Sequence, residues 1–346
     1  MKTRLRLALI SATVALAGLF GATFGSPAAQ AADPLKVAAV LPGAINDQSW
    51  NSLGYQGLQS IEKEFGSEIA YSENVQPADQ IDAIRDYVQR GFNVIFVHGG
   101  QFEDAAITVA EEAPDVTFFV TAGAKGNGKN VIALDAARDQ MMYGLAYLGG
   151  KLSKSGKLGY FTSLEGIPAI VSSVCGFRAG AAAGNPDAQV SVIYLPDMED
   201  VARAREAVLT LVGNGADFVV GDLNRGIQGV LDVSKEKGVL TTGRVGDHIT
   251  LYPEGVVTAA IEDWANMYPS AVRMKVDGRL GTEPLFLGVD AGFYYTYTGK
   301  PGGELADKLN PIVPKDVAEA WLAAMKDVSG GATKIERPEG CDKAGS

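Results

Sequence analysis

The sequence is poor in the residues that build metal centres. It has two histidines, His98 and His248, and two cysteines, Cys175 and Cys341, and all four lie in different segments. A structural zinc site needs four such ligands, usually in closely spaced pairs, so we expect no metal site and no cofactor. The cysteines could pair in an oxidising compartment. Their separation in the sequence gives no geometry, however, and we interpret them as free thiols.

Basic residues are also in deficit. The 30 Lys and Arg residues stand against 41 Asp and Glu residues, which gives a formal net charge of −11. Surfaces that bind nucleic acids or anionic membranes are usually basic. We therefore expect neither as a partner.

Catalytic motifs are missing as well. The sequence contains neither Gly-x-Ser-x-Gly nor His-Glu-x-x-His, the motifs of a serine nucleophile and of a zinc protease. Carboxylate pairs such as Glu111 and Glu112 fall on the surface of a predicted helix, where solvation explains them. We therefore expect a protein that is not an enzyme.

One glycine-rich segment imitates a nucleotide-binding loop. Residues 123–129 (GAKGNGK) match the first seven positions of the phosphate-binding loop. That loop continues with a Ser or Thr that holds magnesium, and it opens a helix. Here the next residue is Asn130, and residues 131–134 (VIAL) are typical of a strand. We interpret the segment as a surface turn.

The first residues have the order of a secretory signal. Residues 1–6 carry three cations, residues 7–20 are largely apolar, and residues 28–32 are small apart from Gln30. A membrane span needs ~20 apolar residues, and this run is shorter. We expect a signal peptide over residues 1–31, cleaved between Ala31 and Ala32 or within a residue or two. No cysteine near the cut could carry a lipid, so the mature protein is expected in the periplasm.

The remainder alternates between short apolar runs and helical patterns. Predicted strands cover 35–41, 94–98, 116–121, 157–161, 190–194, 218–220 and 239–242. Predicted helices lie between them, at 49–65, 78–90, 102–113, 169–183, 201–212 and 226–237. Strands that are apolar along their whole length indicate parallel sheets covered on both faces. About a dozen strands are too many for one open sheet, so we expect two α/β lobes, with a first break near 131–138.

Ligands of parallel sheets bind at the carboxyl ends of the strands. Polar, aromatic and glycine residues follow several of the predicted strands. An alternative for Asn46 or Asp47 is that it caps the next helix, and an alternative for Trp50 is that it packs against the next turn. The candidate ligand-binding residues are Asn46, Asp47, Trp50, Asn51, Gly99, Gly100, Phe102, Asp135, Glu165, Asp222, Asn224, Asp247 and Asp290.

Five segments carry a family likeness. They are 45–51 (INDQSWN) with Gly54 and Gly57, 112–119 (EAPDVTFF), 159–168, 175–184 (CGFRAGAAAG) and 215–218 (GADF). Together they resemble the basic membrane protein family, the substrate-binding proteins of ABC importers, whose characterised relatives bind purine nucleosides or related bases. The likeness covers nearly the whole mature chain in the same order. The Asn-Asp-x-Ser-aromatic-Asn motif is its most specific part.

The resemblance implies the fold of type I periplasmic binding proteins. This fold has two Rossmann-like lobes with parallel sheets, joined by a three-segment hinge whose later crossings would fall near 256–261 and 284–293. We therefore expect an N-terminal lobe of 32–134 plus about 261–288. The C-terminal lobe would comprise 135–260 plus about 289–329, followed by a flexible tail over 330–346.

The resemblance also implies roles for single residues. In nucleoside-binding members, the aromatic at the position of Trp50 stacks on the base, and the neighbouring Asn and Asp residues bind the ligand. The family's Gly-Val-Asp-Ser-Asp-Gln corresponds to residues 243–248, so Val245 replaces an Asp that resembles a ribose ligand. Asp290 replaces a Lys. The base-stacking half of the site is therefore intact, and the ribose half is altered.

These inferences converge on a transport receptor. We expect a monomeric periplasmic protein that captures a small aromatic solute, a purine nucleoside or nucleobase, by lobe closure. Its partner would be an ABC permease in the inner membrane. The alternatives are a receptor for a sugar, a polyol or a flavin-like solute and, from another class, an exported hydrolase.

Overall fold

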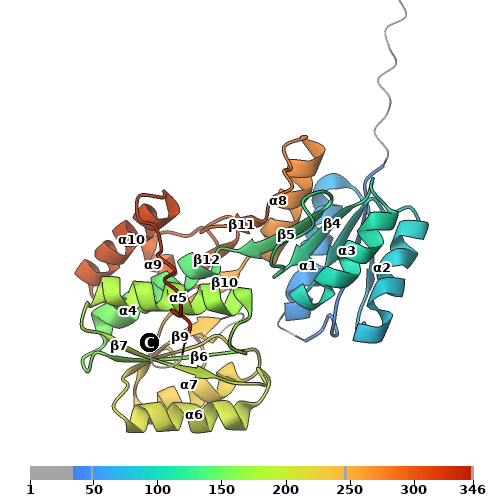
Figure 1. Ribbon diagram of the computed structural model, residues 1–346. Coiled ribbons are helices and arrows are strands. Elements are labelled where there is room, and N and C mark those ends of the chain that lie inside the picture. Colours follow the sequence, from blue (N-terminus) through green and yellow to red (C-terminus); the bar gives the residue numbers. More distant parts are fainter. Residues whose placement is uncertain (1–33, 48–49, 245–247, 344–346) are drawn as a thin grey trace, which may run out of the picture. The chain divides into compact units, whose positions relative to one another are not determined.

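The computed structural model describes residues 34–47, 50–244 and 248–343, and the chain from Leu35 onward forms one compact unit. Within the described residues, the strands form two six-stranded sheets with the orders β11-β5-β4-β3-β1-β2 and β12-β10-β9-β8-β6-β7 (Figure 1). All pairings are parallel except that of β10 with β12. The predicted α/β class with parallel sheets is confirmed.

The strands of the first sheet are β1 (Lys36–Val40), β2 (Glu68–Ser72), β3 (Val94–Val97), β4 (Thr117–Thr121), β5 (Val131–Ala136) and β11 (Leu285–Leu287). Those of the second are β6 (Lys157–Thr162), β7 (Gln189–Tyr194), β8 (Phe218–Gly221), β9 (Leu240–Arg244), β10 (Val256–Glu262) and β12 (Phe293–Thr296). Sequence analysis did not single out β2, because its burial pattern is mixed and it lies at the edge of its sheet.

The helices are α1 (Trp50–Phe65), α2 (Gln80–Gln89), α3 (Glu103–Glu112), α4 (Arg138–Leu152), α5 (Pro168–Gly184), α6 (Val201–Gly213), α7 (Ile227–Lys237), α8 (Trp264–Val276), α9 (Leu305–Lys308) and α10 (Lys315–Ser329). Two short 3-10 helices, η1 (Pro77–Asp79) and η2 (Gly100–Phe102), precede α2 and α3. Among the residues described, no helix is both long and apolar enough to cross a membrane.

Alternating side chains bury both faces of the first sheet. Val37 and Ala39 of β1 pack in the core shared with α1 and α8, whereas Ala38 and Val40 pack in the core under α2 and α3. Successive residues of a strand point to opposite faces, so an unbroken apolar run requires helices on both sides. The second sheet is covered in the same way, by α4 and α5 on one face and by α6 and α7 on the other (Figure 1).

The chain passes from one sheet to the other three times. It leaves the first sheet at the end of β5 to form α4, which packs on α5. It returns from β10 to α8, which packs on α1, and it passes finally from β11 to β12. We call these three passages the crossing segments. They bring the ends of strands from both sheets close to one another.

The two cysteines form a disulfide, so their interpretation as free thiols is wrong. Cys175 lies in α5 and Cys341 near the C-terminus, and their Cα atoms are 5.3 Å apart although 166 residues separate them in sequence. Part of the segment expected as a flexible tail is held at this point. Residues 334–343 are joined to α5 by this bond and by a hydrogen bond from Arg178 Nη2 to the Lys343 carbonyl (2.9 Å).

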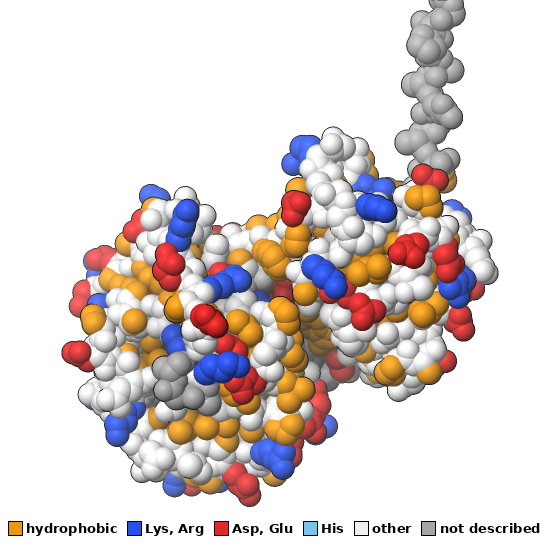
Figure 2. All heavy atoms as spheres, in the orientation of Figure 1, with side chains coloured by type: hydrophobic (Ala, Val, Ile, Leu, Met, Phe, Trp, Pro, Cys, Tyr) orange, Lys and Arg blue, Asp and Glu red, His pale blue; other side chains and the backbone are white. Residues whose placement is uncertain are grey.

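The visible surface carries charges of both signs. Acidic and basic side chains are intermixed over the face shown in Figure 2, and apolar side chains lie between them. On this face there is no broad basic patch of the kind that nucleic-acid binding requires.

Glycines set the distance between α4 and α5. A Cβ placed on Gly180 would lie 2.1 Å from the Tyr143 carbonyl oxygen, and one on Gly176 would lie 2.2 Å from the Asp139 carbonyl oxygen. No side chain fits at such distances, so the two helices can approach this closely only with glycine at both positions. This contact fixes the start of α4, which borders the candidate site.

Gly180→Ala should therefore destabilise the protein. The added methyl group forces the helices apart, and such overpacking costs ~1–3 kcal/mol. Urea denaturation would measure the loss. Gly213→Ala is the matched control, because a Cβ at this helical glycine has no neighbour within 4 Å. Equal stability of the two variants would contradict the close-packing explanation.

Candidate functional site

Five charged side chains form a continuous buried chain beside the crossing segments. They are Asp135 of β5, Arg138 of α4, Glu262 of β10, Arg244 of β9 and Asp222, which follows β8. Arg138 contacts Asp135 (Nε to Oδ2, 2.7 Å) and Glu262 (Nη1 to Oε1, 3.1 Å). Arg244 contacts Glu262 (Nη2 to Oε1, 2.6 Å) and Asp222 (Nε to Oδ1, 2.6 Å). We call these residues the buried charge chain.

The buried charge chain holds three carboxylates and two guanidinium groups, which leaves one negative charge in excess. Burial raises the pKa of Glu262, but the charges of Arg138 and Arg244 outweigh burial and lower it to about 2. Burial raises the pKa of Asp135 in spite of the attraction of Arg138. An N–H donor placed beside Asp135 would stabilise its charged form.

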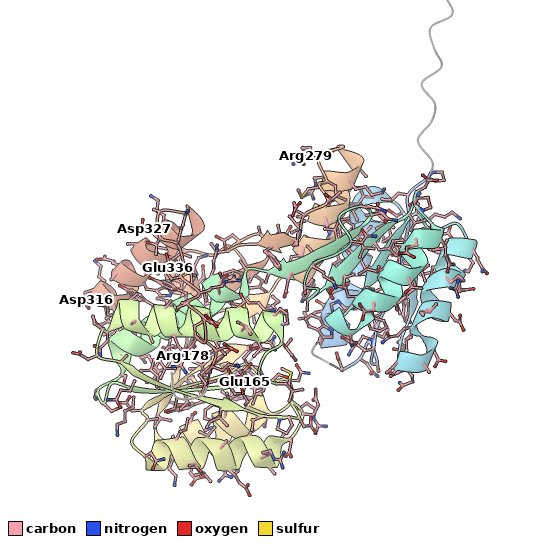
Figure 3. All side chains as sticks on the ribbon, in the orientation of Figure 1. Glu165, Arg178, Arg279, Asp316, Asp327 and Glu336 are labelled. Atoms are coloured by element: carbon pink, nitrogen blue, oxygen red, sulfur yellow. A yellow bond between two sulfur atoms is a disulfide. The ribbon has the colours of Figure 1, made fainter. Side chains whose placement is uncertain are left out.

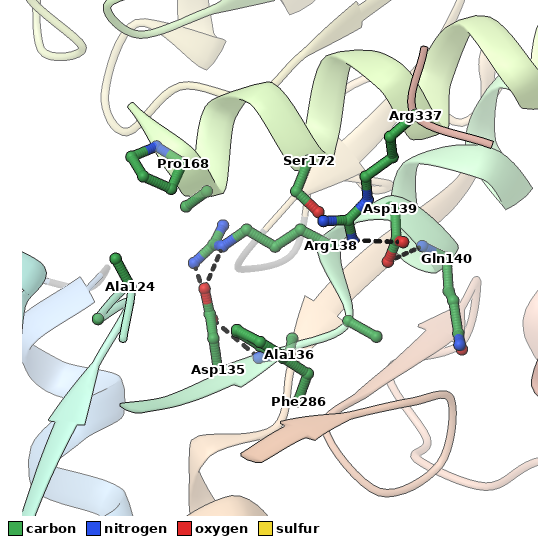
Figure 4. A pocket seen from close by; sticks show the side chains of 13 residues that line it. Ala124, Asp135, Ala136, Arg138, Asp139, Gln140, Pro168, Ser172, Phe286 and Arg337 are labelled. Carbon is green, nitrogen blue, oxygen red and sulfur yellow. Dashed lines mark hydrogen bonds and ion pairs between the residues drawn. The ribbon is translucent and has the colours of Figure 1, made fainter. Parts of the chain in front are cut away.

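A cavity of about 360 Å³ opens beside Asp135 and Arg138 (Figure 4). Phe286 on β11 contributes an aromatic side chain that is 54% exposed. Cavities of roughly 300–1,000 Å³ are typical of small-molecule sites. We call this space the junction cavity. Its lining residues are Gly123, Ala124, Asp135, Ala136, Ala137, Arg138, Asp139, Gln140, Pro168, Ala169, Ser172, Phe286 and Arg337.

Trp50 is held against His98 at the start of α1. The two rings are stacked with their centroids 4.2 Å apart, and the ring of Trp264 meets Trp50 edge-on at 5.3 Å. The Trp50 indole N–H donates to the His98 carbonyl (3.1 Å), and His98 Nε2 donates to the Trp50 carbonyl (2.8 Å). Trp50 is only half-buried. The protein therefore fixes the ring on one side and leaves part of it exposed.

His98 is a buried neutral histidine. Because the Trp50 carbonyl can only accept, Nε2 carries the proton and Nδ1 is an acceptor, facing Tyr268 Oη at 2.9 Å and Thr121 Oγ1 at 3.1 Å. Burial lowers the pKa of His98 to about 4. The ring therefore serves as a neutral support beneath Trp50 at neutral pH.

Two of the polar residues predicted near Trp50 are used within the protein. Asp47 caps α1, since its carboxylate accepts from the N–H groups of Asn51 (2.9 Å) and Ser52 (2.9 Å). The Asn51 side chain donates to Asp47 (2.7 Å) and accepts from the Gly43 N–H (2.9 Å). Capping, the alternative considered for this segment, is what the structure shows for Asp47. Asn46 is exposed.

The residues that follow β3 shape the backbone there and fill part of the core. Gly99 has φ 148°, a conformation that favours glycine, and a Cβ on Gly100 would lie 2.5 Å from the Ala122 carbonyl oxygen. Phe102 is fully buried in the core under α2 and α3. Its prediction as a ligand contact is therefore corrected, because its ring fills the core of the first sheet.

The remaining candidate residues do not all meet at one place. Asp135 and Asp222 belong to the buried charge chain. Glu165 and Asp290 are exposed, and each pairs with a lysine, at 3.1 and 3.3 Å. Asn224 donates to Glu199 (2.7 Å). None of these last three lines the junction cavity. Asp247, like Val245, lies outside the described residues.

The glycine-rich segment 123–129 binds the protein's own carboxylate. Glu103 accepts the backbone N–H groups of Ala124 (3.2 Å), Lys125 (3.0 Å) and Gly126 (2.8 Å). These consecutive donors are the groups that a phosphate would need. Strand β5 follows the segment, as predicted, and its interpretation as a turn agrees with the structure.

Several residues of the site were missed in the sequence. Arg244 and Glu262 each end a strand that is otherwise uncharged. A charge at the end of a buried strand is rarely left unpaired, and this signal could have identified them. No local pattern marks Phe286 or Arg337, because only the folded chain brings them to the start of α4.

Two mostly parallel sheets joined by three crossing segments define a type I solute-binding protein fold. An ABC transporter solute-binding protein from Conexibacter woesei has this fold, with a TM-score of 0.67 and 22% identity over 88% of this chain and 99% of that chain. Residues 35–294 match the family model Bmp, described as ABC transporter substrate-binding protein PnrA-like. The chain belongs to this family, which confirms the resemblance seen in the sequence.

Two relatives show how far the sequence similarity extends along the chain. A purine-binding protein of Brucella abortus is 26% identical over 317 residues, which cover 86% of this chain and 89% of the relative. The transcriptional activator protein med of Bacillus subtilis is 29% identical over 234 residues, covering 67% and 72%. The first aligns with most of both chains.

The stability of the protein should fall in weak acid because of His98. Its pKa is 6.5 ordinarily and about 4 when folded, so between these values the unfolded chain binds a proton that the folded protein does not. The free energy of unfolding is unaffected by His98 above pH 6.5. It decreases as the pH falls from 6.5 toward 4, by roughly 3 kcal/mol at most, because only the unfolded chain binds the proton. Urea denaturation at pH 7, 6 and 5 would measure it. His98→Asn should show a shallower pH dependence; an unchanged slope would contradict the assignment.

Proposed function

We propose that this chain is the exported receptor of an ABC importer and that it captures a purine base or a purine-like heterocycle. In this proposal its signal peptide is removed near Ala31, and the mature monomer works in the periplasm with an inner-membrane permease. The observation that carries the proposal is the junction cavity. Its walls come from the first sheet, from α4 and α5, and from the β11 crossing segment, so a ligand there contacts both halves of the chain.

The buried charge chain is suited to hold the crossing segments together at a hinge between the two lobes. Arg138 follows one crossing segment and Glu262 precedes another, and their ion pair is buried. A buried pair resists separation, because removing one partner leaves an uncompensated charge and costs ~3–5 kcal/mol. The pair would hold two crossing segments together while the two lobes close on the ligand.

The chemistry of the site fits a flat heterocycle with N–H groups. Phe286 offers an aromatic surface at the cavity wall, and Asp135 is a buried acceptor there. Trp50 does not line the cavity and offers a second aromatic surface in the first half of the chain. A cavity of about 360 Å³ lies near the small end of the range for ligand sites. A purine base combines a stacking face with ring N–H donors. The purine-binding relative from Brucella abortus supports the same ligand class.

The second half of the site favours a free base over a nucleoside. Arg244 stands where the family motif has a Val, and it engages Asp222 and Glu262. Those carboxylates are therefore engaged by a guanidinium group, and neither of them lines the junction cavity. Asp290 places an acid where the family has a Lys. Ribose would gain few partners in this site.

Hypoxanthine should therefore bind with an affinity close to that of inosine. A hydroxyl left without a partner on burial costs ~1–3 kcal/mol, and this cost offsets any contact that the ribose makes. Isothermal titration calorimetry with both compounds on one preparation measures the difference. Inosine binding a hundred times more tightly than hypoxanthine would contradict the preference, and binding of neither would contradict the proposed ligand class.

Trp50→Ala should weaken hypoxanthine binding tenfold to a hundredfold. Stacking of a base on an aromatic side chain contributes ~1–3 kcal/mol, which corresponds to that change in Kd. Calorimetry gives the affinity, and thermal unfolding without ligand shows whether the fold has suffered. Phe286→Ala is the comparison, because Phe286 lines the junction cavity and Trp50 does not. Lost affinity in Phe286→Ala with unchanged affinity in Trp50→Ala would transfer the stacking role to Phe286.

A further inference from the structure

Residues 334–343, which we call the strap, are fastened to the second half of the chain. The disulfide joins Cys341 to α5, and the Tyr194 hydroxyl of β7 donates to the Asp342 carbonyl. Lys343 Nζ lies 3.1 Å from Glu165 Oε1, in the segment that precedes α5. Figure 3 labels Glu165 and Arg178 where α5 meets the strap. The strap lies outside residues 35–294, the part of the chain that matches the family model.

The strap delivers one side chain to the junction cavity. Arg337 lines the cavity opposite the first turn of α5, and its Nη2 lies 2.6 Å from Asp139 Oδ2 at the start of α4 (Figure 4). Its side chain is 51% exposed. An ion pair with one partner half exposed to solvent is weakened by screening, so stability alone does not explain why the strap holds a guanidinium group at this point.

Arg337 supplies hydrogen-bond donors to its edge of the cavity. A guanidinium group has five N–H donors and no acceptor, and among the described residues Asp139 is the one carboxylate that it contacts. The carboxylate oxygens of Asp139 already accept from Arg337 and from the Gln140 N–H (2.9 Å). Across the cavity, the first turn of α5, with Pro168 and Ala169, adds the positive end of a helix dipole. This edge therefore suits a ligand oxygen rather than a ligand amino group.

We propose that Arg337 is a specificity-determining residue that recognises a carbonyl oxygen of the heterocycle, and that the Cys175–Cys341 bond positions it. The proposal rests on the proposed function, since it takes a purine to be the ligand. It makes the site selective for an oxopurine over an aminopurine. A carbonyl accepts from the guanidinium group, whereas an amino group offers it only another donor.

Calorimetry of the full-length mature protein with hypoxanthine and adenine tests this selectivity. Arg337→Gln should weaken hypoxanthine binding about tenfold or more, the usual range for loss of a hydrogen bond to a charged group, and should leave adenine binding nearly unchanged. Arg279→Gln is the matched control, because Arg279 pairs with Asp277 in an exposed ion pair beyond α8 (Figure 3). Unchanged hypoxanthine affinity in Arg337→Gln, or an equal loss for both purines, would overturn the proposal.

The double variant Cys175→Ser/Cys341→Ser tests the role of the disulfide. It should reproduce the selective loss of hypoxanthine affinity, because the strap no longer holds Arg337 at the cavity. Circular dichroism and the ligand-free melting curve establish that the variant is folded. A folded variant with wild-type selectivity would overturn the positioning role. If the unmodified protein binds neither purine, the proposed function is wrong and this proposal fails with it; binding without Arg337-dependent selectivity would reject this proposal alone.

Discussion

The ion pairs of Arg138 and Arg244 with Glu262 determine how the rest of the site is arranged. Glu262 is fully buried and accepts from both guanidinium groups. Its other contact is the indole N–H of Trp264, at 3.1 Å from Oε2. Trp264 in turn supports the edge of Trp50. One carboxylate thus connects the crossing segments to the aromatic group of the first half.

The arrangement divides the site into a rigid part and an exposed part. Asp135, Arg138 and the His98 ring are buried and make several contacts each, so their positions are fixed before a ligand arrives. Preorganised groups of this kind lose little freedom on binding. Phe286 and Arg337 are exposed, come from other parts of the chain, and border the same cavity. Recognition would therefore combine a rigid, buried part of the site with exposed side chains at its edge.

Most of the fold could be predicted from the sequence, because the buried strands are continuous apolar runs with helical patterns between them. Strand β2 was not singled out because an edge strand with mixed burial lacks that signal. The candidate site was predicted less well. Asp135 and Asp222 were among the candidate residues, and they lie at the ends of strands. Their partners were not named: Arg138 follows Asp135 by three residues without forming a recognised motif, and Arg244 reaches Asp222 only through the pairing of β8 with β9. Phe102 was wrongly predicted to contact the ligand, because an aromatic residue after a strand gives the same sequence pattern whether its ring faces the cleft or the core.

The disulfide also constrains the order in which the molecule can mature. A polypeptide emerges from the ribosome with its N-terminus first, and Cys341 follows every strand and helix of the described residues. Cys175 therefore waits as a thiol through the synthesis of the next 166 residues. By the time its partner appears, the segments of both sheets have all been made. The bond can accordingly form only after every strand and helix of the described residues has been synthesised.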